Sequence, residues 1–152
     1  MMLKRVSAFL IALLTSSMLY AATLELVDGD TRLVLDVDAL VASATESHVA
    51  FAPFRKRTVE FRGHDFEAFL QQYLKHKVSR VNVTAVDGYQ VSLSGIEGQT
   101  WMLVTHEDGK PLELRTHGPL RLIQTNIGDR DPNNMSLFDD WIWMIERIEV
   151  VD

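Results

Sequence analysis

Apolar and polar residues alternate along much of the chain, in short runs separated by turn residues. This alternation is typical of strands that bury one face. An Asp-Gly turn at 28–30 separates the first two runs and predicts a hairpin. Gly63 and Pro53 are expected to end strands, because each interrupts such a run. The predicted strands, in chain order, are 24–27, 32–35, 48–54, 59–61, 81–85, 90–93, 101–105, 112–115, 120–123 and 141–151.

Two segments follow the period of a helix instead. Apolar residues recur every three or four positions after Asp65, which predicts a helix with Asp65 as its N-cap and 75–77 at its basic end. A shorter helix is expected through 39–41, capped by Asp36 or Asp38. A polar loop should run from 124 to about 140. Many short strands with two short helices favour one domain of the α+β class, mainly β.

The first residues have the pattern of an export signal. Lys4 and Arg5 precede an uncharged run at 6–14, and small residues follow up to Ala22. This order predicts a secretory signal peptide over 1–22, cleaved after Ala21 or Ala22, and a mature domain over 23–152. An uncleaved membrane anchor is the alternative. We expect a periplasmic protein that is not inserted in the membrane after cleavage.

Charge and residue content exclude several functions. The chain has 15 Lys and Arg against 21 Asp and Glu, so its net charge is −6, or 13 − 21 = −8 after loss of Lys4 and Arg5. An acidic protein repels nucleic acid, so no nucleic-acid partner is expected. There is no cysteine, which removes disulfides, thiolate metal sites and a thiol nucleophile. The sequence has no paired-histidine metal motif, phosphate loop or Gly-x-Ser-x-Gly elbow. Four of the five histidines are expected at the surface.

Five motifs in the same order resemble the sulfite oxidase-like family, whose domain binds molybdopterin. The resemblance covers most of the mature chain and implies that family's fold. The motifs are Phe61-Arg62-Gly63 with Phe69-Leu70, Asp87-Gly88-Tyr89 within 84–93, Asp108-Gly109-Lys110-Pro111-Leu112, Gly118-Pro119-Leu120-Arg121-Leu122, and Trp141 with Ile148-Glu149-Val150.

The missing cysteine separates this chain from the enzymes of that family. Their thiolate ligand to molybdenum would fall near 48–54, where Val49, Ala50, Phe51 and Ala52 cannot bind a metal. The chain instead resembles small exported pterin-binding proteins of the PruR type, although Asp139-Asp140 and Arg121 differ from their usual residues. That resemblance implies a binding protein without catalysis or molybdenum. It would present a reduced pterin to an inner-membrane sensor with cyclic-di-GMP synthase and phosphodiesterase domains.

Two other functions stay open at this stage. One is a molybdopterin-dependent oxidoreductase with an atypical metal site, and the other is an interaction domain with an empty pocket.

A pterin is a flat polar ring system, which calls for aromatic walls and a few carboxylate or guanidinium groups. Phe54 is expected to stack and Arg55 to make a polar contact. One of Trp141 and Trp143 should lie in the core and the other in the pocket wall, whereas Trp101 should be buried. The remaining candidates are Asp87, Tyr89, Arg121, Asn126 and Asp140.

Overall fold

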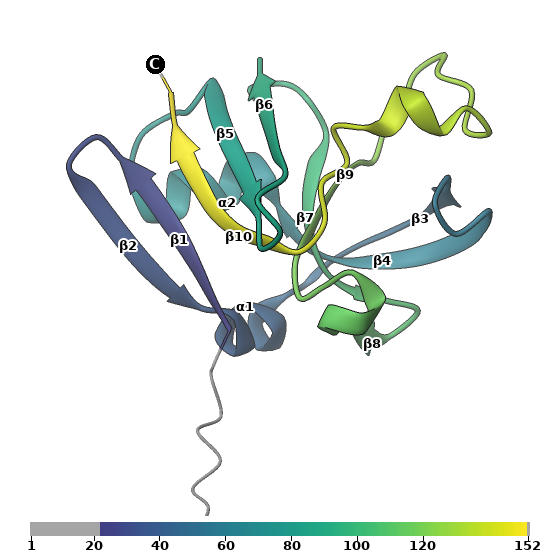
Figure 1. The fold of residues 1–152 in the computed structure, drawn as a ribbon, viewed down its shortest axis with the longest axis horizontal. Helices are drawn as coiled ribbons and strands as arrows, with labels where there is room; N and C mark the ends of the chain where they lie inside the picture. The colour runs from purple at the N-terminus through teal and green to yellow at the C-terminus, as the bar shows by residue number, and fades with distance from the viewer. Residues whose placement is uncertain (1–21, 152) are drawn as a thin grey trace, which may run out of the picture.

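The computed structural model describes residues 22–151, and these form two β-sheets and two α-helices (Figure 1). This confirms the α+β, mainly β class. The signal peptide predicted over 1–22 falls almost wholly outside the described residues. Among residues 22–151, no helix is both long and apolar enough to span a bilayer.

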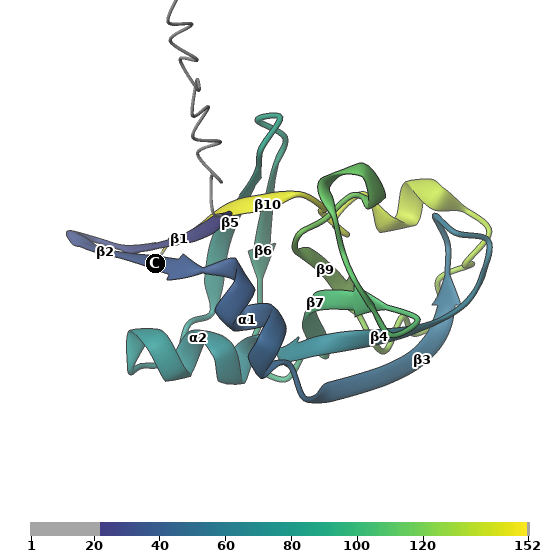
Figure 2. The same ribbon diagram turned by 90° about the horizontal axis from the view of Figure 1, so that it is seen from below.

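The first sheet has five strands in the order β2-β1-β10-β5-β6. Its central pair, β1 and β10, is parallel, so the first and last strands of the described chain lie side by side, with Leu26 opposite Ile148. The other neighbours are antiparallel. Both helices cover one face of this sheet (Figure 2). The strands are β1 (Thr23–Asp28), β2 (Thr31–Asp36), β5 (Arg80–Ala85), β6 (Gln90–Ser94) and β10 (Ile145–Val150).

The two helices begin at the predicted caps. Asp36 accepts a hydrogen bond from the Asp38 backbone and starts α1 (Val37–Ser43). Asp65 accepts one from the Ala68 backbone at 2.8 Å and starts α2 (Phe66–Leu74). Lys75 adopts a left-handed conformation and ends α2, so the basic segment 75–77 follows the helix and does not form its last turn.

The second sheet contains β3 (Glu46–Ala52), β4 (Arg57–Asp65), β7 (Trp101–Glu107) and β8 (Lys110–Pro111), in that order. A fifth strand, β9 (Arg121–Gln124), also pairs with β7. Contrary to expectation, Gly63 does not end its strand. A Cβ at Gly63 would lie 2.0 Å from the Leu103 carbonyl oxygen, so the glycine allows β4 to approach β7 closely where their register shifts. Pro53 does follow the last residue of β3.

One predicted strand was wrong, and another begins later than expected. The segment 112–115 does not form a strand, because Leu114–Thr116 forms the short 3-10 helix η1. The closing strand begins only at Ile145, because Met144 has a positive φ of 54° and bends the chain before it. Within the polar loop, Met135–Phe138 forms a second short 3-10 helix, η2. These irregular segments lie at one end of the second sheet and form much of the candidate site.

The core lies between the sheets and beneath the helices. Phe61, Phe66 and Leu103 are among its fully buried side chains. Trp101 is 3% exposed, which confirms that it belongs to the core. Because α2 contributes Phe66, Phe69 and Leu70, its apolar face faces inward as the spacing predicted.

Candidate functional site

One cavity of about 320 Å³ has mainly aromatic walls, and we call it the aromatic cavity. Its lining comes from three parts of the chain that are distant in sequence: the β3–β4 turn, the β5–β6 turn, and the segment from the last residue of η2 to Trp143. Five of the nine sequence candidates line it together. The lining residues are Phe54, Asp87, Tyr89, Phe138, Asp139, Trp141, Ile142 and Trp143.

Trp143 lines the cavity and forms a β-bridge with Arg121 of β9. Its ring meets Phe54 edge to face, with ring centres 4.9 Å apart, and lies 4.8 Å from the His117 ring. The Arg121 guanidinium lies over the same ring, 5.8 Å from its centre. Trp143 is partly exposed, whereas Trp141 is 3% exposed. Trp141 is therefore buried and Trp143 half-buried, but both line the aromatic cavity, whereas only one of them was expected in the pocket wall. They do not share the face of a strand, because β10 begins only at Ile145.

Tyr89 connects the β5–β6 turn with the segment that follows η2. Its hydroxyl donates to the Asp139 carbonyl at 2.9 Å, and its backbone N–H donates to Asp87 Oδ1 at 3.0 Å. Nearly half of the Tyr89 side chain is exposed. The second carboxylate oxygen of Asp87 has no hydrogen-bond donor within residues 22–151, so it is available to a ligand in the cavity.

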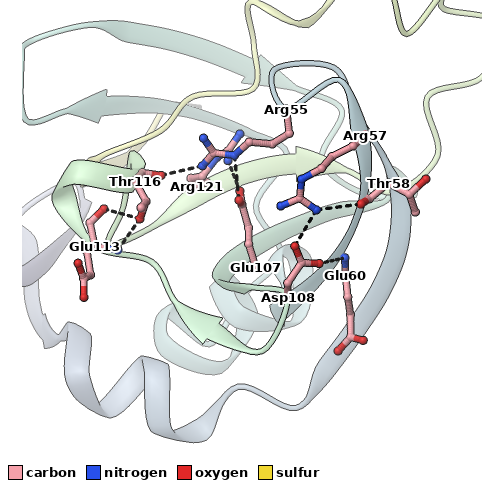
Figure 3. A network of polar contacts seen from close by, with 9 residues as sticks. All are labelled: Arg55, Arg57, Thr58, Glu60, Glu107, Asp108, Glu113, Thr116 and Arg121. Atoms are coloured by element: carbon pink, nitrogen blue, oxygen red, sulfur yellow. Dashed lines mark hydrogen bonds and ion pairs between the residues drawn. The ribbon is translucent and has the colours of Figure 1, made fainter.

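Arg55 and Arg121 do not line the aromatic cavity, and both bind the carboxylate of Glu107. Arg55 donates from Nε to Glu107 at 2.9 Å and from Nη2 to the Thr116 carbonyl. Arg121 donates to the other oxygen of the same carboxylate (Figure 3). Its side chain is 2% exposed and its Nε has no hydrogen-bond partner among the described residues. Burial lowers the pKa of the Arg121 guanidinium, and the neighbouring Glu107 opposes that shift.

A larger hollow of about 750 Å³ opens beside this ion pair, and we call it the basic groove. It extends from the β3–β4 turn over β8 to η1. The groove is polar, with four cationic and three anionic side chains at its surface. Its lining residues are Arg55, Arg57, Glu107, Asp108, Lys110, Pro111, Leu112, Glu113, Arg115 and Thr116.

Asn126 and Asp140 line neither hollow. Asn126 accepts a hydrogen bond from the Gly128 backbone and so shapes the loop after β9. Asp140 lies 3.7 Å from Arg130, and one of its oxygens is buried without a hydrogen bond. Burial raises the pKa of the Asp140 carboxyl, and Arg130 only partly offsets this. Both side chains contact residues of the loop between β9 and η2, Gly128 and Arg130 respectively.

Several residues that complete the site could hardly be recognised from the sequence. Phe138, Asp139 and Ile142 line the aromatic cavity, and His117 packs against its wall. The apolar pair Leu137-Phe138 inside a polar loop was one local sign. Glu107 ends a strand with no feature that marks it as a partner of two arginines.

The arrangement suits recognition of a flat, polar aromatic molecule. Both hollows fall within the roughly 300–1,000 Å³ typical of ligand pockets. The aromatic side chains of Phe54, Tyr89 and Trp143 line the cavity together with Asp87. Residues 22–151 contain no group of three or more His, Asp or Glu side chains that could hold a metal ion. Comparison with models of known families finds no match for this chain, and comparison with curated proteins finds none either.

His106 should make the stability of the fold depend on pH. It is 4% exposed, which is contrary to the surface position expected for most histidines, and its ring bonds Thr105. Burial, and secondarily Arg62, lowers its pKa from 6.5. The unfolded chain therefore binds more protons than the folded chain as the pH falls. The contribution of His106 to the free energy of unfolding is fully present above about pH 6.5, and it is lost as the pH drops through the lower pKa of the folded state.

Thermal melts of the wild type and His106→Gln between pH 7.5 and 5 would measure this effect. The wild type should lose more melting temperature over that interval than the variant. Parallel losses would contradict the assignment to His106.

Proposed function

We propose that the protein binds a reduced pterin in the aromatic cavity and acts as an exported sensor subunit. The observation that carries this proposal is that the aromatic residues Phe54, Tyr89 and Trp143 line one cavity together with Asp87. These residues come from three separate turns, and a hydrogen bond between Tyr89 and Asp139 holds two of these turns together. A site built in this way has the concave aromatic surface that a flat ring system needs.

The chemistry of a pterin matches the groups in the cavity. Its faces gain from offset or edge-on contact with Phe54 and Trp143. Its amino-pyrimidinone edge carries N–H donors, which suit the available oxygen of Asp87. The cavity volume of about 320 Å³ accommodates a bicyclic ring with a short side chain.

The family resemblance supports the same proposal. The motifs that resemble sulfite oxidase-like domains include Asp87-Gly88-Tyr89 and Trp141, and both contribute to the cavity lining. We therefore propose the fold of that family as well. The chain has no cysteine to bind molybdenum as those enzymes do, so we propose ligand binding and not redox catalysis.

The basic, apolar and then small residues of 1–22 support export to the periplasm. The resemblance to exported pterin-binding proteins supports a partner in the inner membrane, with cyclic-di-GMP synthase and phosphodiesterase domains. Co-purification of the tagged protein with such a sensor from membranes, stronger when reduced pterin is added, is the expected result. Trp143→Ala, which alters the cavity wall, provides the comparison. If the variant and the wild type recover the same amount of sensor when pterin is added, ligand-dependent sensing is contradicted.

Replacing Phe54 with alanine should weaken pterin binding by about 1–3 kcal/mol, by analogy with the stacking of bases on aromatic side chains. Phe54 lines the cavity and contacts Trp143, so its loss removes one wall. Isothermal titration with tetrahydromonapterin measures the effect. Phe51→Ala is the matched control, because Phe51 lies on the preceding strand and outside the cavity lining. Equal affinities for both variants and the wild type would remove Phe54 from the site.

A further inference from the structure

The basic groove carries an excess of positive charge on an acidic protein. Together with the buried Arg121 beneath it, the groove has five cationic side chains and three carboxylates, a balance of 5 − 3 = +2. The whole chain has a formal charge of −6. We propose that this groove is a second binding site, separate from the aromatic cavity, for an anionic group of the phosphate or carboxylate class.

One unit of this excess charge lies at the floor of the groove, where 2 − 1 = +1. Arg55 and Arg121 each bond one oxygen of Glu107, so a single carboxylate serves two guanidinium groups (Figure 3). Glu107 and Arg121 have side chains only 10% and 2% exposed, so water screens this imbalance poorly. An anion bound in the groove would neutralise the remaining charge.

Cationic side chains at the rim of the groove can bind such an anion with little loss of folding stability. Arg57 pairs with Asp108 and Arg115 with Glu113, but these are exposed pairs that contribute little to stability. Lys110 forms no close ion pair among residues 22–151, although its charge acts on the Asp108 carboxylate. Guanidinium groups bind phosphate and carboxylate through paired hydrogen bonds, so Arg57 and Arg115 can exchange partners for a ligand.

The groove and the aromatic cavity adjoin at one tight turn. Phe54 lines the cavity and Arg55, the next residue, lines the groove. The backbone N–H groups of Arg55 and Lys56 both donate to the Ala52 carbonyl, at 3.0 and 2.8 Å, which fixes this turn. The anion can therefore come from two sources: a charged side chain on the molecule held in the cavity, or a separate anion.

Isothermal titration at low ionic strength with three probes tests the site and separates these sources. The probes are inorganic pyrophosphate, tetrahydrobiopterin with its uncharged side chain, and tetrahydroneopterin monophosphate. The groove variant is Lys110→Gln with Arg115→Gln, two exposed side chains outside the aromatic cavity. The matched control is Lys77→Gln with Arg32→Gln, which removes the same charge from exposed positions outside the groove.

The groove variant should bind at least one of the two anionic probes about tenfold more weakly than the wild type, or worse still, because charge-assisted hydrogen bonds are lost. The control should bind like the wild type. Preference for the phosphorylated pterin over tetrahydrobiopterin identifies a charged side chain as the source, and binding of pyrophosphate without that preference identifies a separate anion.

Equal affinity of the groove variant and the control for both anionic probes would overturn the proposal, as would no binding of either probe. The pterin function is judged separately, because it depends on tetrahydrobiopterin. If pyrophosphate binds in the groove and tetrahydrobiopterin does not bind, the anion site stands and the proposed pterin function fails. If tetrahydrobiopterin binds, and both anionic probes bind the groove variant and the control equally, the proposed pterin function stands and the anion site fails.

Discussion

Replacing Glu107 with alanine should destabilise the protein by about 3–5 kcal/mol, because it leaves the buried Arg121 without a counter-charge. Arg121 is 2% exposed, and Glu107 is the only carboxylate paired with it among the described residues. The same change removes the partner of Arg55, which ties the β3–β4 turn to β7. Denaturation by urea measures the loss as a lower midpoint with an unchanged slope.

Two comparisons separate this effect from the loss of a surface charge. Glu113→Ala breaks an exposed pair and should cost less than about 1 kcal/mol. Arg121→Leu removes the buried charge itself while Arg55 still holds Glu107, so its loss should be smaller than that of Glu107→Ala. Combining Glu107→Ala with Arg121→Leu should recover part of the loss. Similar costs for Glu107→Ala and Glu113→Ala would contradict a buried ion pair at this position.

Replacing Trp141 with alanine should also cost about 3–5 kcal/mol, the range for large aromatic residues in a core. Its ring is 3% exposed and meets the buried Phe138 edge to face, with centres 5.0 Å apart. Trp143 is partly exposed, so Trp143→Ala should cost less stability and more ligand affinity. Urea denaturation and ligand titration of the two variants, side by side, measure this division. The opposite order of stabilities would contradict the assignment of Trp141 to the core.

Local patterns predicted the parts of the fold that depend on neighbouring residues. The hairpin at 24–35 follows from alternation around an Asp-Gly turn, and both helices begin at an aspartate N-cap. Gly63 was misinterpreted, because its role is the close approach of Leu103 from a distant strand, which local sequence does not reveal. The late start of β10 has a similar cause. Before it, the backbone of Ile142 bonds Leu122, so the chain follows β9 there.

The candidate site shows the same limit. Phe54, Asp87 and Trp143 could each be chosen from residue type and position, but only the fold places them in one cavity. Arg55 was expected beside Phe54 in the ligand site, yet the tight turn directs it to Glu107 and the basic groove. The sharing of Glu107 between two arginines depends on tertiary pairing, and no spacing in the sequence encodes it.

Titration of the protein with tetrahydromonapterin, followed by tryptophan fluorescence, tests the pterin proposal most directly. Two of the three tryptophans, Trp141 and Trp143, line the aromatic cavity. Saturable quenching is expected beyond the absorbance effect seen with free tryptophan, and it should be greatly reduced in Trp143→Phe. Bound ligand should also raise the melting temperature. Absence of both quenching and a melting shift at millimolar pterin would contradict the proposed function.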